Sequence, residues 1–129
     1  MPFLIYDYLD ENNVNVVKEW ILKNVQKKQR IKLNQKIDAL SLHGLTLIPN
    51  ILTGTHIGGI QKIRVKGNVQ LRPLLCIHHG KIVEFTFLNG GKEVGGDWQP
   101  VNAVEIADLN KTSLLTDMAN RRIIHVRVN

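Results

Sequence analysis

The stretch IQKIRVKGNVQLRPLLCIHHGKIVEFTF, residues 60–87, contains three runs of β-forming residues that are separated by turn signals. Gly67 and Asn68 follow the first run, and Gly80 follows the second. Glycine and asparagine tolerate the positive φ that tight hairpins require. The pattern therefore predicts a three-stranded antiparallel meander with strands at 60–66, 69–78 and 82–88.

Positive charge gathers on one face of this predicted meander. Side chains alternate along a strand, so Lys62, Arg64 and Lys66 share one face of the first run. Arg72 lies inside the otherwise apolar second run. If Arg72 lies beside that row, the four cations repel one another unless an anion lies between them. We expect that anion to be phosphate.

Composition favours one globular domain over residues 1–129, since 43% of the 129 residues are hydrophobic. The net charge of +6 favours an anionic partner, and nucleic acid is the first candidate. Cys76 is the only cysteine, which excludes a disulfide framework and indicates a small core residue. The amino terminus lacks a signal-peptide pattern and no apolar run is long enough to cross a bilayer. We therefore expect a cytoplasmic protein without membrane contact.

The amino-terminal third predicts a short strand at Phe3–Leu9 and then two helices. Asn13 is the expected cap of the first helix, which continues to Val25. The second helix is expected at Gln26–Leu42, ending near Gly44. Its predicted inward residues are Ile31, Leu33, Ile37 and Leu40, and its outer face carries Lys28, Lys32 and Lys36. A lysine-rich outer face is ordinarily solvated; alternatively it binds RNA.

The remaining segments predict loops, a third helix and a last strand. Residues 44–59 are expected to form an irregular, packed connection, and residues 89–96 a glycine-rich loop that carries Lys92. A helix is expected from Pro100 to about residue 110 with Trp98 at its start, and a strand within 119–128. The expected fold class is α+β, with an antiparallel sheet packed on one face by the two amino-terminal helices and a further helix after the meander.

The chemical motifs favour phosphate contacts over metal or carboxylate chemistry. Five histidines suggest a metal hypothesis, but none are paired at i,i+4 on a predicted helix and there is no HExxH motif, so we expect no metal and no cofactor. Preorganised cations stabilise the charge that grows on phosphoryl oxygens when a ribose 2′-hydroxyl attacks its phosphate. The alternative is a basic sheet face that only binds an acidic protein surface or a nucleic-acid backbone.

The order of predicted elements and three short motifs resemble the RelE/HigB-like toxins of bacterial type II toxin–antitoxin systems, particularly the phage and prophage branch. The motifs are KIRVK at 62–66, Arg72 in LRPLL, and Lys92 after the third long strand. The resemblance covers Phe3 to about Leu114. It implies a RelE-like fold and an mRNA interferase, an endoribonuclease that cleaves messenger RNA, usually on the ribosome, and is inhibited by a cognate antitoxin.

The resemblance also implies roles for individual residues. Lys62, Arg64, Arg72 and Lys92 are the expected catalytic residues, which hold and stabilise the scissile phosphate. Lys66 is expected to bind RNA on the same basis. The other expected RNA-binding residues follow from the sequence pattern and not from the resemblance: Lys28, Lys32 and Lys36 as a basic helix face, and Trp98 as an aromatic ring that stacks on a base. Family members often carry a late tyrosine or histidine that activates the 2′-hydroxyl; here the late candidates are Trp98 and His125. The alternative function is a non-catalytic phage-encoded module that binds RNA, ribosome or protein.

Overall fold

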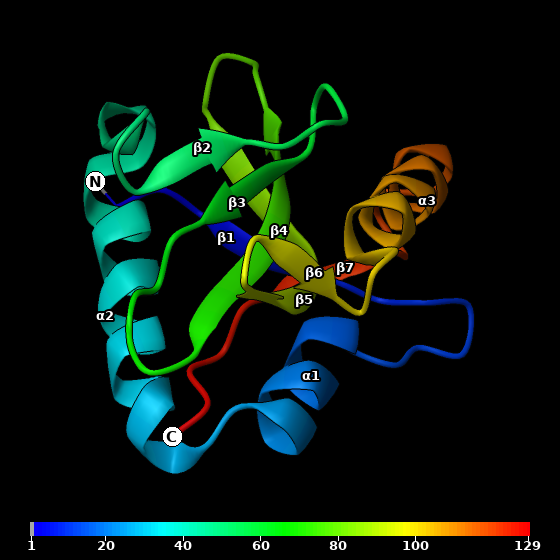
Figure 1. Ribbon diagram of the computed structural model, residues 1–129. Helices are drawn as coiled ribbons and strands as arrows, with labels where there is room; N and C mark the ends of the chain where they lie inside the picture. The colour runs from blue at the N-terminus through cyan, green and yellow to red at the C-terminus, as the bar shows by residue number, and fades with distance from the viewer. Residues whose placement is uncertain (1) are drawn as a thin grey trace.

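The computed structural model describes residues 2–129 and has an α+β fold with three helices and an open, mixed, seven-stranded sheet (Figure 1). The elements in chain order are β1 (Ile5–Tyr8), α1 (Val16–Asn24), α2 (Lys27–His43), the 3-10 turn η1 (Gly44–Leu47), β2 (Leu52–Gly54), β3 (Gln61–Ile63), β4 (Gln70–His78), β5 (Glu84–Val94), β6 (Asp97–Gln99), α3 (Ala103–Thr116) and β7 (Arg122–Ile124). The sheet order is β2-β3-β4-β5-β1-β7, with β6 also paired to β5.

The predicted meander is present as β3, β4 and β5, but the sheet as a whole is mixed. β1 pairs with β5 in parallel, with Ile5 opposite Phe85, and all other pairs are antiparallel. The expectation of an antiparallel sheet is therefore wrong at β1. A local pattern does not determine which distant strand β1 joins, because this pairing links residues about 80 positions apart in the chain.

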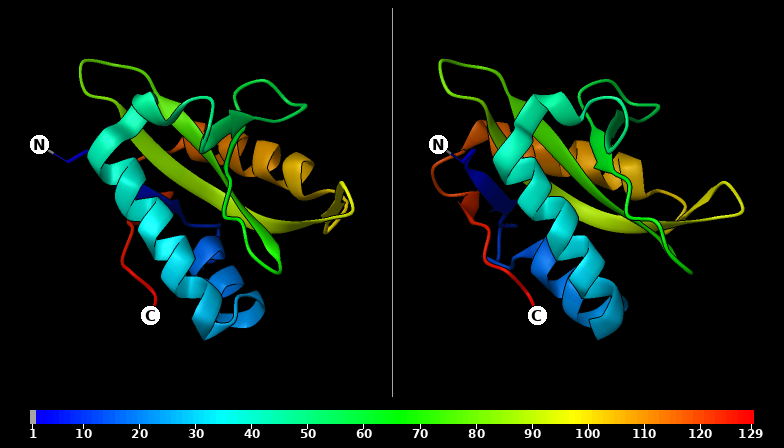
Figure 2. Two further views of the ribbon diagram at one scale, coloured as in Figure 1. Left: turned by 60° about the vertical axis from the view of Figure 1, so that its left-hand side comes forward. Right: turned by 90° about the vertical axis from the view of Figure 1, so that its left-hand side faces the viewer.

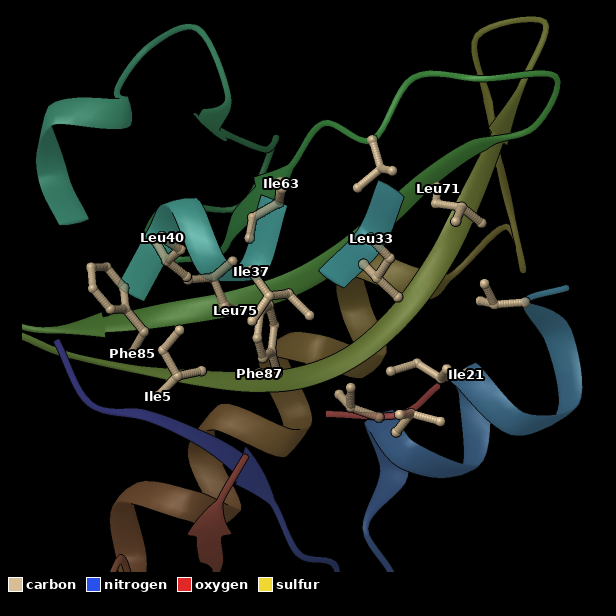
Figure 3. Packing of buried hydrophobic residues seen from close by; sticks show 14 of the residues in the cluster. Ile5, Ile21, Leu33, Ile37, Leu40, Ile63, Leu71, Leu75, Phe85 and Phe87 are labelled. Carbon is tan, nitrogen blue, oxygen red and sulfur yellow. The ribbon is translucent and has the colours of Figure 1, made fainter. Parts of the chain in front are cut away.

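The sheet separates two hydrophobic cores, one under α1 and α2 and the other under α3 (Figure 2). Alternation along β4 sends Leu71 and Leu75 toward the first core, and Leu74 and Cys76 toward the second. Figure 3 shows the first core, in which side chains of α2 face those of the central strands. Its labelled members include Leu33, Ile37 and Leu40 of α2, Ile63 of β3, Leu75 of β4, and Phe85 and Phe87 of β5.

The two amino-terminal helices are close to the predicted positions, with two corrections. Asn15, and not Asn13, caps α1: its side-chain oxygen accepts a hydrogen bond from the Lys18 backbone N–H at 2.9 Å. Asn13 instead has a φ of 59° in the preceding turn. Ile31 was expected inward but is 63% exposed. It lies two residues before Leu33, which places it on the opposite side of a helix with 3.6 residues per turn.

The predicted glycine-rich loop at 89–96 is mostly strand. β5 continues to Val94, and only Gly95 and Gly96, with φ of 59° and 88°, form the turn to β6. Gly90 is needed inside the strand because α1 approaches closely: a Cβ there would lie 2.1 Å from Trp20 Cδ2. Lys92 and Trp98 therefore lie on strands, and not on a loop or at a helix start.

Three further segments differ from expectation. The connection at 44–59 contains η1 and β2, which pairs with β3. Regular pairing of β3 ends at Ile63, and only an isolated bridge at Val65 continues it. α3 begins at Ala103 and continues to Thr116, beyond the predicted end. The last predicted strand is present as β7, and no helix within residues 2–129 is long and apolar enough to span a membrane.

Candidate functional site

The four expected catalytic cations do not form one patch, and only two of them lie together. Lys62 is opposite Leu74 in the β3–β4 pairing, so Lys62 and Arg72 point to the face that α3 covers. Both donate to the same carboxylate oxygen, Glu93 Oε1, at 2.7 Å and 3.0 Å. The Lys62 ammonium also lies 5.5 Å from the centre of the Trp98 ring. Trp98 thus packs beside a cation of the chain itself.

Glu93 and neighbouring oxygens occupy the donors of Arg72. Nε donates to Glu93, Nη1 donates to the Leu71 carbonyl at 2.9 Å, and Nη2 donates to Gln70 Oε1 at 3.3 Å. The guanidinium is buried, with 7% of the residue exposed. This arrangement satisfies the cation internally, so a phosphate at this position would have to displace the Glu93 carboxylate.

Lys92 lies on the other face of the sheet. It is opposite Leu71, which belongs to the core under α1 and α2. Lys92 lines a hollow of about 210 Å³ together with Trp20 and Asn24 of α1 and with Gln99 and Pro100. Because the sheet separates Lys92 from Arg72, these two side chains cannot bind one phosphate group in this conformation.

Arg64 and Lys66 lie beside the lysines of α2 and form a separate basic surface. One hollow, of about 470 Å³, lies between α2 and the chain after β3; its lining includes Lys32, Lys36, Arg64 and Lys66. An adjoining hollow of about 440 Å³ shares Lys32 and Lys66 with it and adds Lys28. We call the two hollows together the basic groove, lined by Lys28, Lys32, Lys36, Arg64 and Lys66.

Local structure explains why these five cations meet. Lys28, Lys32 and Lys36 are spaced four apart, so they lie on one side of α2. Arg64 follows the last regular residue of β3, and its backbone N–H donates to the Ile51 carbonyl at 2.9 Å. After β3 the chain is tied to β4 only by the Val65–Leu71 bridge and passes beside α2 (Figure 1). Arg64 and Lys66 there line one hollow with the lysines of α2.

The basic groove carries unneutralised positive charge. Among residues 2–129, none of those that line its two hollows is acidic. None of the ion pairs formed within the described chain includes a groove cation. The amino-terminal end of α2 contributes further partial positive charge near Lys28. A bound polyanion would relieve the repulsion among these side chains.

The amide side chains that line the groove between its cations were not identified from the sequence. The amide side chains in its lining are those of Gln26, Gln29, Gln35, Asn50 and Asn68. The repeated glutamines between the lysines of α2 were the available signal. Asn50 belongs to the connection before β2, so no local pattern indicates that it joins this surface.

His125, the late candidate for a general base, is part of a buried pair outside the groove. Its Nδ1 lies 2.9 Å from Asp7 Oδ1, and Asn15 donates to the other Asp7 oxygen at 2.9 Å. The following residues cross the helices, where Asn34 donates to the Val128 carbonyl at 3.0 Å. These contacts attach the end of the chain to β1 and α2.

Two other titratable groups have shifted pKa values that indicate a neutral, structural state. Burial raises the pKa of the Cys76 thiol to about 11, which agrees with its interpretation as a core residue. Burial lowers the pKa of His78, whose Nε2 lies 2.8 Å from the Thr86 hydroxyl. Within residues 2–129 no group of three or more histidine, cysteine or acidic residues is arranged to hold a metal ion.

Replacing Glu93 with glutamine is expected to lower the free energy of unfolding by about 1 kcal/mol at neutral pH. Burial raises the pKa of Glu93, but the nearby Lys62 and Arg72 outweigh burial and hold that pKa below its ordinary value of 4.5. A lowered pKa stabilises the fold above the unfolded pKa, and this stabilisation is lost as the pH falls through the folded pKa.

Urea denaturation of Glu93→Gln and the unmodified chain at a series of pH values measures this difference. It should be present at neutral pH and disappear in acid. Glu19→Gln is the control, because the exposed pair of Glu19 with Lys23 contributes little. Equal stability of the Glu93 variant and the unmodified chain at neutral pH would contradict the expectation.

No protein-family model matches the sequence, and no curated protein matches it.

Proposed function

We propose that the chain binds RNA, holding the sugar–phosphate backbone in the basic groove. The observation that carries the proposal is the lining of this groove, where five cations and no carboxylate within residues 2–129 surround two adjoining hollows. Cations that neutralise phosphates release counterions, and this release drives sequence-independent binding of nucleic acid. The net charge of +6 assists the encounter with a polyanion.

The proposed ligand is RNA, and not DNA, because the sequence resembles mRNA-cleaving toxins. Four of the residues expected from the sequence to bind RNA, Lys28, Lys32, Lys36 and Lys66, are groove cations. The toxin role, with mRNA at the ribosome as the target and a cognate antitoxin as the inhibitor, stays a prediction. So does the cytoplasmic location.

Binding is favoured over cleavage. The mechanism expected from the sequence needs Lys62, Arg64, Arg72 and Lys92 at one phosphate. Lys62 and Arg72 share Glu93 on one face of the sheet, Lys92 lies on the other face, and Arg64 lines the groove. The proposal is therefore the non-catalytic alternative of the two functions that the sequence suggested.

The test measures the affinity of the purified chain for a short, fluorescently labelled single-stranded RNA by fluorescence anisotropy, over a range of salt concentrations. For about five phosphate contacts with a single strand, we expect the logarithm of the association constant to fall with the logarithm of the salt concentration with a slope of roughly −3.5. The same RNA is then analysed on a denaturing gel and should remain intact. Absence of binding at low salt would overturn the proposal. Cleavage of the RNA would instead favour the endoribonuclease function over binding alone.

A further inference from the structure

The two hollows of the basic groove differ in chemistry. Four cations, Lys32, Lys36, Arg64 and Lys66, make up half of the lining of the hollow of about 470 Å³; the others are Gln35, Asn50, Ile51 and Val65. The adjoining hollow of about 440 Å³ has a smaller share of cations, which are Lys28, Lys32 and Lys66. Besides its lysines it contains three amide side chains and three apolar ones, those of Gln26, Gln29, Asn68, Val65, Val69 and Leu71.

The second lining suits a nucleobase better than a phosphate. A base offers two apolar faces and an edge of hydrogen-bond donors and acceptors, whereas a phosphate offers only charge and acceptors. Val65 and Leu71 are buried at 2% and 1% exposure and belong to the core, so they form a fixed apolar floor. A volume of about 440 Å³ is within the range of small-ligand sites, roughly 300–1,000 Å³.

Amide groups at the rim of this hollow are available to contact a base edge. Gln29 Oε1 accepts a hydrogen bond from the Gln26 backbone N–H at 3.3 Å, and the NH₂ group of the same amide is a further donor in the lining of this hollow. Asn68 is exposed at the turn between β3 and β4, where its amide offers both a donor and an acceptor. Such paired groups match the mixed donors and acceptors of a base.

We propose that the hollow lined by Gln29, Asn68 and Val69 holds one unpaired base of the RNA, while the neighbouring phosphate lies among Lys32, Lys36, Arg64 and Lys66. This inference rests on the proposed function and narrows it to unpaired RNA. In a duplex the bases are stacked and their edges are paired, so none can enter the hollow without being unpaired. Lys32 and Lys66 line both hollows and lie where base and phosphate meet.

The experiment compares three ligands of equal length by fluorescence anisotropy: a single-stranded RNA, an abasic ribose–phosphate strand, and an RNA duplex. The abasic strand should bind about tenfold more weakly than the complete strand, since apolar contact and hydrogen bonds to the base are lost. The slope of the salt dependence should be equal for the two single strands, because their phosphates make the same contacts. The duplex should bind no better than the abasic strand.

A variant locates the base contact. Asn68→Ala should weaken binding of the complete RNA about fivefold and leave the abasic strand unchanged. Asn12→Ala removes an exposed amide that is not part of the groove, and it should change neither affinity. Circular dichroism of both variants verifies the fold.

The outcomes separate this inference from the function on which it rests. Equal affinity for the complete and abasic strands overturns the base site and leaves RNA binding in place. A duplex that binds as tightly as the single strand also overturns the base site and leaves RNA binding in place. Failure of all three ligands to bind at low salt overturns both.

Discussion

Alanine at Lys32, Lys36 and Lys66 together is expected to lower the affinity for single-stranded RNA about 100-fold at roughly 0.1 M salt. Each phosphate contact of a single strand contributes about 0.7 to the slope of the salt dependence. The counterion-release term vanishes at roughly 1 M salt. Lowering the salt from there to roughly 0.1 M therefore raises the association constant about fivefold for each contact. Three contacts multiply to about 100-fold, and the slope should become shallower by about 2.

Fluorescence anisotropy over a salt series measures both quantities. The matched control is alanine at Lys18, Lys23 and Lys81, which removes three charges from exposed lysines that do not line the groove. This control should retain most of the affinity, because distant exposed charges are screened by salt. Equal losses in the two triple variants would mean that net charge, and not the groove, determines binding.

Replacing Gly90 with alanine is expected to destabilise the fold by about 2–3 kcal/mol. The added Cβ would lie 2.1 Å from Trp20 Cδ2 and 2.4 Å from Trp20 Cε2, inside the packed contact between α1 and β5. The indole cannot leave without opening a cavity, and it cannot stay without moving α1 away from the sheet. Urea denaturation followed by circular dichroism gives the change in the free energy of unfolding.

Two further variants identify the cause of this loss. Gly54 is also a strand glycine, but the nearest atom to its added Cβ, Gln61 Oε1, is 4.0 Å away, so Gly54→Ala should cost little. Trp20→Ala removes the clashing ring, and in that background Gly90→Ala should cost much less than in the unmodified chain. If Gly90→Ala costs the same with and without Trp20, the close approach of α1 is not the reason for glycine at this position.

Sequence periodicity predicted the parts of the fold that depend on neighbouring residues. The alternation of β4 and its turn after Gly67 place Arg72 on the same face as Lys62, as expected. The spacing of four places the three lysines on one side of α2. In both cases a single helix or hairpin fixes the side-chain direction, so a short window of sequence contains the information.

The remaining parts depend on contacts between distant segments. Gly90 and Gly91 are typical of a loop in sequence, yet they are residues of β5. The missing side chains leave space for close packing of Trp20 against Gly90 and of Ala103, at the start of α3, against Gly91. Arg64 continues the alternation of β3, but regular pairing ends one residue earlier and the chain then follows α2. Alternation alone does not show where a strand ends, and this missing boundary led to the prediction of a single phosphate patch.

The most direct test of the central claim is a titration of the ¹⁵N-labelled chain with single-stranded RNA, followed in two-dimensional NMR spectra of the backbone amides. The account predicts that the largest shifts occur at residues 26–36 and 64–69, which line the basic groove. Small shifts are expected at Lys62, Arg72 and Trp98, which Glu93 and the core already engage. Largest shifts around Glu93 and Lys92, with the groove unchanged, would contradict the account.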